Sequence, residues 1–378
     1  MKNSILFLKK IAVVVIVLLT NYGVSQTYEF QTVKEINCTP VVSQGKTGTC
    51  WSFSSTSFLE SEIMRITGKT IDLSEMYSVR HTYPKKAFNY VMRQGKAQFG
   101  EGGLNHDVIN SALEFGLVPE SVYSGKVNST EFDHTKMVVE LEKIVKTTVE
   151  TPTPFNTSWK ANFEAVLDQY MGKNITDFTY EGKKYTPKQF LEFTGLKLDN
   201  YLTITSFMHE PYYTKFILNI PDNFANGAMY NLPLDEFIST IDNSLENGFT
   251  VALDADVSEK SFSGQRGIAV VPFNDTDIPA VFKEIKKEKT ITPELRQAEF
   301  ENLNTTDDHL MHIVGKVKDQ NGTIYYKVKN SWGKDSGKEG YVYMSVSYMR
   351  LKAISVLIHK DALNKKNKKY FRNFILTD

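Results

Sequence analysis

The stretch Gln44-Gly45-Lys46-Thr47-Gly48-Thr49-Cys50-Trp51-Ser52-Phe53-Ser54 decides how the rest of this 378-residue chain is interpreted. It leads into residues 50–67, where apolar side chains recur at helical spacing up to Gly68, a residue typical of helix C-termini. We therefore predict a helix over 50–67 with Cys50 in its first turn. A helix N-terminus favours negative charge, so this position should lower the pKa of the thiol and make Cys50 a nucleophile. Taken alone, Cys50 could equally be a small buried apolar side chain.

Gln44 lies six residues before the cysteine. Its side-chain amide could join the backbone N–H of Cys50 in stabilising an oxyanion. Gly45 and Gly48 would let the loop bend close to a substrate. The alternative is that Gln44 is an ordinary surface residue.

A cysteine nucleophile needs an imidazole base, and the base needs a third group that fixes its tautomer. His309 and His312 are the candidates for the base, and the amide of Asn330 is the candidate for the third group. A two-residue Asn321-Gly322 turn would pair residues whose numbers have an odd sum, which puts His309 on the same face as Asn330. A single β-bulge would reverse this choice in favour of His312.

The two histidines also raise the alternative of a metal site completed by Asp307 or Asp308. Two residues three apart on a strand point to opposite faces, so this arrangement does not suit one metal ion. We predict neither a metal nor another cofactor.

The composition limits the partners. Lys and Arg total 44, Asp and Glu total 44, and the formal charge is zero. This balance argues against a dedicated binder of nucleic acid or anionic membranes. Two cysteines, Cys38 and Cys50, are too few for a disulfide framework or a cysteine-rich zinc module. The lysine-rich segment 365–372 is most simply a solvated tail.

The first 25 residues are typical of a secretory signal peptide. Lysines precede the apolar run 11–19, and the small-residue pattern Gly23-Val24-Ser25 suits cleavage before Gln26. The apolar run is too short to span a bilayer, so we expect export to the periplasm or the medium after cleavage near Ser25, without stable membrane insertion.

Hydrophobic patterns divide the remainder of the chain. Helical spacing dominates residues 26–125, including a second helix over 106–115. We interpret the polar region 126–235 as an insertion that elaborates the core fold. Strand patterns follow in 236–378, at 249–257, 267–271, 309–317 and 323–332. This predicts an α+β protein with a helical first half and a β-rich second half.

The segments around Cys50, Asp308-His309 and Lys329-Asn330-Ser331-Trp332-Gly333 resemble, in order and internal spacing, the active-site blocks of papain-like cysteine peptidases. Further segments resemble the branch formed by bleomycin hydrolase and bacterial aminopeptidase C. These segments are Leu73-Ser74-Glu75, Gly116-Leu117-Val118-Pro119, Asn231-Leu232-Pro233, 249–257 and Thr292-Pro293-Glu294-Leu295-Arg296. The resemblance is loose between about residues 126 and 225.

The resemblance implies a papain-like fold of two lobes, with the nucleophile on a helical lobe, the base on a β-barrel-like lobe and the cleft between them. It implies a thiol protease acting on peptide substrates. The implied roles are Cys50 as nucleophile, His309 as base and then acid, Asn330 as its orienting residue and Gln44 as oxyanion donor. Trp332 would shield the His309–Asn330 hydrogen bond, and Gly102-Gly103 would align the substrate as an added strand. Structural alternatives are core filling for Trp332 and a simple turn for the glycine pair.

Departures from the family pattern leave the specificity open. Thr47 stands where many papain-like enzymes have a cysteine that forms a disulfide, and this difference fits the branch. It implies that Cys50 is free and that Cys38 is unpaired and buried. The alternative is a Cys38–Cys50 disulfide. The branch consists mostly of intracellular hexamers, so the resemblance raises the alternative that this protein is a homo-oligomer. Its C-terminal tail blocks one end of the cleft and produces aminopeptidase action, whereas the tail here is short and divergent. An endopeptidase and a non-catalytic binding protein with this fold are the alternatives.

Overall fold

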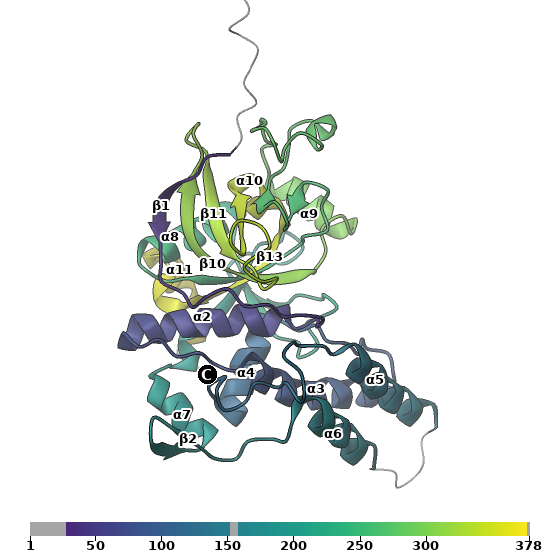
Figure 1. The fold of residues 1–378 in the computed structure, drawn as a ribbon. Helices are drawn as coiled ribbons and strands as arrows, with labels where there is room; N and C mark the ends of the chain where they lie inside the picture. Colours follow the sequence, from purple (N-terminus) through teal and green to yellow (C-terminus); the bar gives the residue numbers. More distant parts are fainter. Residues whose placement is uncertain (1–27, 152–157, 376–378) are drawn as a thin grey trace, which may run out of the picture.

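The computed structural model describes residues 28–151 and 158–375, and the predicted signal peptide lies outside them. The chain folds around one long sheet and one central helix, α2 (Cys50–Thr67). In Figure 1 the sheet lies on one side of α2 and the helices α3 to α7 lie on the other. The helices after α2 are α3 (Glu75–Met92), α4 (Asn105–Phe115), α5 (Thr135–Glu150), α6 (Ser158–Met171), α7 (Pro187–Thr194), α8 (Leu234–Glu246), α9 (Pro293–Glu301), α10 (Val346–Lys352) and α11 (Lys365–Ile375).

The main sheet has the order β5-β6-β4-β13-β7-β10-β11-β12-β9-β8, and β1 pairs with β10. Its strands are β1 (Gln31–Glu35), β4 (Tyr201–Thr205), β5 (Lys215–Ile217), β6 (Ala228–Asn231), β7 (Val251–Ala255), β8 (Phe262–Ser263), β9 (Ile268–Ala269), β10 (His309–Lys318), β11 (Ile324–Lys329), β12 (Tyr341–Ser345) and β13 (Ala353–His359). A separate hairpin joins β2 (Phe178–Tyr180) and β3 (Lys183–Tyr185). Pairing is mostly antiparallel, with parallel pairs at β4–β6 and β9–β12.

Helix α2 has the predicted bounds. Gly68 ends it in the left-handed conformation, at φ 71°, and its N–H donates to the carbonyl of Met64. Every residue from Cys50 to Ile63 is buried, because α2 is covered from both sides. Ile66 is one of the helically spaced apolar residues of 50–67, but it lies beyond this covered part and is exposed.

The boundaries between regions differ from the predicted ones in two places. The N-terminal strand β1 pairs with β10 and so joins the sheet of the β-rich half, not the helical part. The region 126–235 supplies β4, β5 and β6, which extend the main sheet from β13. Both additions depend on pairing with strands that are distant in sequence, which local patterns do not reveal.

Candidate active site

Cys50 is the first residue of α2 and is buried. Burial raises the pKa of its thiol to about 12, although a hydrogen bond from the backbone of Leu310 lowers it in part. The expectation that the helix N-terminus lowers this pKa is therefore wrong for the unliganded protein. Loss of hydration is the largest cause, and the carboxylates of Asp222, Asp254 and Asp307 raise the pKa further.

Strand β10 runs alongside α2 and brings its first residue to the cysteine. The Ser54 hydroxyl, one turn after Cys50, donates to the carbonyl of Met311 at 2.5 Å. The Ser57 hydroxyl lies 2.9 Å from Nδ1 of His312. Together with the Leu310–Cys50 contact, these bonds fix the start of β10, which is His309, at the N-terminal end of α2.

His309 and Asn330 meet as predicted. Nε2 of His309 lies 2.8 Å from Oδ1 of Asn330, which also accepts from the N–H of Ser331. An imidazole that donates from Nε2 keeps Nδ1 free of a proton, as a base requires. Burial lowers the pKa of His309 to about 4, while the bond to Asn330 acts in the opposite direction. Burial therefore favours the neutral forms of the Cys50 thiol and the His309 imidazole.

His309, and not His312, is the histidine that bonds to Asn330, but the predicted two-residue turn is wrong. The strands pair up to Lys318 and Ile324, so the loop is longer than Asn321-Gly322 and the pairing parity is even. A bulge between Ile313 and Gly315 then restores the odd parity. The two errors cancel, because each shifts the register by one residue.

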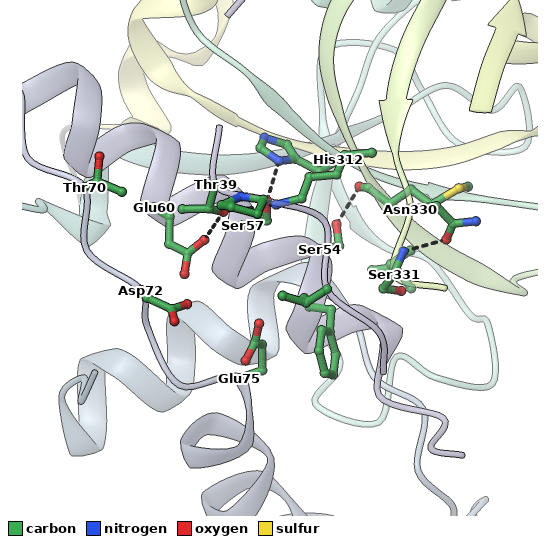
Figure 2. Close-up of a pocket in the computed structure, with 16 residues that line it drawn as sticks. Thr39, Ser54, Ser57, Glu60, Thr70, Asp72, Glu75, His312, Asn330 and Ser331 are labelled. Atoms are coloured by element: carbon green, nitrogen blue, oxygen red, sulfur yellow. Dashed lines mark hydrogen bonds between the residues drawn. The ribbon is translucent and has the colours of Figure 1, made fainter. Parts of the chain in front are cut away.

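His312 points away from this site. It bonds to Ser57, and it lines a cavity of about 230 Å³ behind α2 that Asn330 and Ser331 also border (Figure 2). Lys329 also lines this cavity, and its ammonium group donates to the hydroxyls of Thr39 and Ser57. Within the described residues, no cluster of three or more His, Cys, Asp or Glu side chains could hold a metal ion.

Gln44 is buried beside the end of β11, not on the surface. Its backbone N–H donates to the carbonyl of Ser331, and its Oε1 accepts from the Ser331 hydroxyl at 2.5 Å. Its Nε2 donates to the carbonyl of Thr47 at 2.6 Å. An amide nitrogen has two hydrogens, so Gln44 keeps a second N–H for an oxyanion.

Trp332 covers the imidazole. The ring centres of Trp332 and His309 lie 4.8 Å apart at an interplanar angle of 31°. Trp332 keeps 39% of its surface exposed, so simple core filling does not describe it. A side chain at Gly264 would collide with the indole, which explains a glycine at that position.

The pair Gly102-Gly103 lies against the first turn of α2. A Cβ at Gly103 would come within 3.1 Å of the Trp51 ring, and the indole N–H of Trp51 donates to the carbonyl of Glu101. A Cβ at Gly102 would come within 2.0 Å of Oδ2 of Asp222. The glycines are thus required by close approach, and Gly102 adjoins a carboxylate that the sequence interpretation did not single out.

Both cysteines are free. Cys38 is half-buried and contacts the hydroxyl of Tyr341 at 3.6 Å, so the expectation of a buried Cys38 is wrong. The alternative of a Cys38–Cys50 disulfide is not seen. Among the helices of residues 28–151 and 158–375, none is long and apolar enough to cross a membrane.

Comparison with known proteins gives consistent matches. The sequence profile of the Peptidase C1-like family matches residues 84–377. Aminopeptidase C of Lactococcus lactis subsp. cremoris is 24% identical over 366 residues, covering 86% of this chain and 81% of that protein. Aminopeptidase G of Lactobacillus delbrueckii subsp. lactis is 22% identical over 381 residues, covering 86% and 82%. The crystal structure of pepw from Lactobacillus rhamnosis matches with a TM-score of 0.70 at 19% identity, covering 91% and 85%. The predicted papain-like fold class is confirmed.

Proposed function

The chain belongs to the Peptidase C1-like family of cysteine-type peptidases, and from this premise we propose that it is an aminopeptidase that uses Cys50, His309 and Asn330. The observation that carries the proposal is the 2.8 Å bond between His309 and Asn330 at the end of α2 that bears Cys50. The similarity to proteins named aminopeptidase C and aminopeptidase G supports the exopeptidase specificity.

The proposed reaction is acyl transfer through a thioester. The Cys50 thiol passes its proton to Nδ1 of His309 as the sulfur attacks the carbonyl carbon of the first peptide bond. The N–H of Cys50 and the amide of Gln44 hold the resulting oxyanion. The C–N bond breaks as the imidazolium protonates the leaving amine. Water then attacks the thioester, gives its proton to His309, and the thiol re-forms as the amino acid leaves.

Cys50→Ala tests the chemistry. We expect it to abolish release of a fluorescent amine from aminoacyl substrates, because no other group can form the thioester. Cys38→Ala is the matched control and should retain activity, since Cys38 contacts the hydroxyl of Tyr341 and forms no hydrogen bond with His309 or Asn330 in the described part of the chain. Undiminished hydrolysis by the Cys50 variant would leave a binding protein as the remaining function.

A peptide with a free or an acetylated N-terminus separates the two peptidase specificities. An aminopeptidase removes single residues from the free form and leaves the acetylated form intact. Internal cleavage of both forms would identify an endopeptidase.

We also propose that the protein is exported. The lysines before the apolar run 11–19 and the Gly23-Val24-Ser25 pattern support this. Mass spectrometry of the protein isolated from the extracytoplasmic fraction should find Gln26 at the N-terminus. An intact Met1 form confined to the cytoplasm would contradict export.

A further inference from the structure

Three carboxylates from distant segments gather beside the candidate active site. Asp254 lies on β7 and is fully buried, Asp307 lies two residues before the start of β10, and Asp222 lies in the loop between β5 and β6. The pairing of β7 with β10 places Asp254 opposite Leu310, whose backbone contacts Cys50. All three charges raise the pKa of Cys50, so they act on its sulfur directly through space.

Asp254 and Asp307 have few partners besides each other and the backbone of Asp222. Both oxygens of Asp307, and Oδ1 of Asp254, are buried without a hydrogen-bond partner of ordinary geometry in the described part of the chain. Oδ2 of Asp254 has one long contact, 3.4 Å from the Ser355 hydroxyl. Two buried carboxyl groups that face one another retain a proton between them, and a bound cation would compensate their charge in place of that proton.

The protein supplies little positive charge for them. Lys86 is a buried cation that interacts with Asp222 and Asp307; its Nζ donates to the carbonyl of Gly102, and its charge lowers the pKa of Asp222. Burial and then Asp307 raise the pKa of Asp254, whereas burial and then Asp222 raise that of Asp307 to about 7. The charged neighbours that act most strongly on Asp254 and Asp307 are thus other carboxylates.

The cluster also adjoins the proposed path of the substrate. The Asp222 carboxylate occupies the space where a side chain at Gly102 would project. Gly102-Gly103 is the pair expected to align the substrate backbone. In an amino acid, the α-nitrogen is only about 2.5 Å from the carbonyl carbon, because two covalent bonds separate them. An α-ammonium group beside Cys50 would therefore lie close to these carboxylates.

We propose that Asp222, Asp254 and Asp307 bind the α-ammonium group of the substrate's N-terminal residue and so position its first peptide bond at Cys50. This inference rests on the proposed peptidase function and explains exopeptidase specificity by residues of the folded chain. The bound ammonium also favours the ionised form of these carboxyl groups and offsets the negative charge that opposes ionisation of Cys50. A substrate with a free N-terminus therefore activates the thiol that attacks it.

The first experiment measures binding without turnover. In the Cys50→Ala protein, calorimetry compares one peptide with a free or an acetylated N-terminus. We expect the free form to bind at least tenfold more tightly, and Asp254→Asn with Asp307→Asn to remove that difference. Equal affinities in the Cys50→Ala protein would overturn the proposal and leave peptidase chemistry untouched.

The second experiment measures kcat/KM with Cys50 present. Asp254→Asn and Asp307→Asn, which preserve shape, should each lower kcat/KM for the free-amine substrate about 10- to 100-fold. Asp275→Asn is the matched control, because Asp275 is an exposed carboxylate that pairs with Lys289. An equal loss in the control would overturn the specific role. Loss of all hydrolysis by the unmutated protein would instead refute the proposed function.

Two further experiments test whether a lysine side chain of the substrate can replace its α-amine, and whether the terminal carboxylate of the chain binds the ammonium instead of the three aspartates. An N-acetylated peptide with an internal lysine carries the same ammonium chemistry on a side chain, and preferential cleavage next to that lysine would overturn the assignment to the α-amine. Removing residues 376–378 relocates the terminal carboxylate of the chain. The free-amine preference should survive this truncation, and its loss would assign ammonium recognition to the tail.

Discussion

Burial governs the chemistry of Cys50 and His309 more than the charges around them. Burial raises the pKa of the thiol to about 12 and lowers that of the imidazole to about 4. A sequence shows that a cysteine begins a helix, but it does not show how much water reaches the sulfur. For this reason the position of Cys50 was predictable and its ionisation was not.

The raised pKa makes a prediction about alkylation. Only the thiolate reacts with iodoacetamide, so the labelling rate of Cys50 in the unliganded protein should rise about tenfold per pH unit between pH 6 and 9. Mass spectrometry of the Cys50 peptide measures this rate. A plateau below pH 8 would mean that a thiolate–imidazolium pair already exists, contrary to the burial argument.

Asn330 carries a second prediction. Asn330→Ala removes the acceptor that holds His309 at 2.8 Å, so kcat should fall about 100-fold, within the range that a positioned base contributes. The nucleophile stays, so activity should remain measurable. Asn321→Ala in the exposed hairpin loop is the control and should leave kcat unchanged. An Asn330→Ala protein with normal kcat would mean that the pair is structural only.

The candidate site was predictable where motifs are local and unpredictable where it depends on tertiary pairing. Gln44 and Cys50 are six residues apart, and His309 and Asn330 lie on adjoining strands of one hairpin. Asp222 and Asp254 come together with Asp307 only when β7 pairs with β10 and the β5–β6 loop folds over Gly102. One signal was present: Asp254 interrupts an otherwise apolar strand, Val251-Ala252-Leu253-Asp254-Ala255.

At the scale of elements, α2 is specified by its ends as well as by its apolar face. Gly68 adopts φ 71°, and a Cβ added there would meet no atom within 4 Å. Gly68→Ala should therefore lower the free energy of unfolding by about 1 kcal/mol through backbone strain alone. Urea denaturation measures this. Gly100→Ala, where φ is not left-handed and the nearest atom is 3.8 Å away, should not lower it. Equal losses would mean that the helix end is not the cause.

Strands were predictable in proportion to their burial. β10 is buried over nearly its whole length and was expected within one residue of its bounds. β1 was not expected, because four of its five residues are exposed and its alternation is weak. β9 is shorter than the predicted 267–271, since only Ile268 and Ala269 find pairing partners on β8 and β12.

At the scale of the whole molecule, α11 packs against β6 and α8, although its sequence predicted a solvated tail. Phe371 is fully buried and packs on Tyr230 of β6 at a ring distance of 4.5 Å, and Lys366 pairs with Glu236 of α8. Most residues of this segment are polar, and the sequence prediction therefore overlooked the apolar side of the helix that packs on the sheet.

Truncation of that buried ring should therefore be costly. Phe371→Ala removes a large side chain from a closed site, so the free energy of unfolding should fall by about 3 kcal/mol. Tyr370→Ala is the adjacent control: Tyr370 is 46% exposed and stacks on Tyr213, so its loss should cost less than about 1 kcal/mol. Urea denaturation of both variants decides the point. Similar losses, or limited proteolysis that removes 365–378 without lowering the stability of the remainder, would show that α11 is an attachment to the fold and not part of its core.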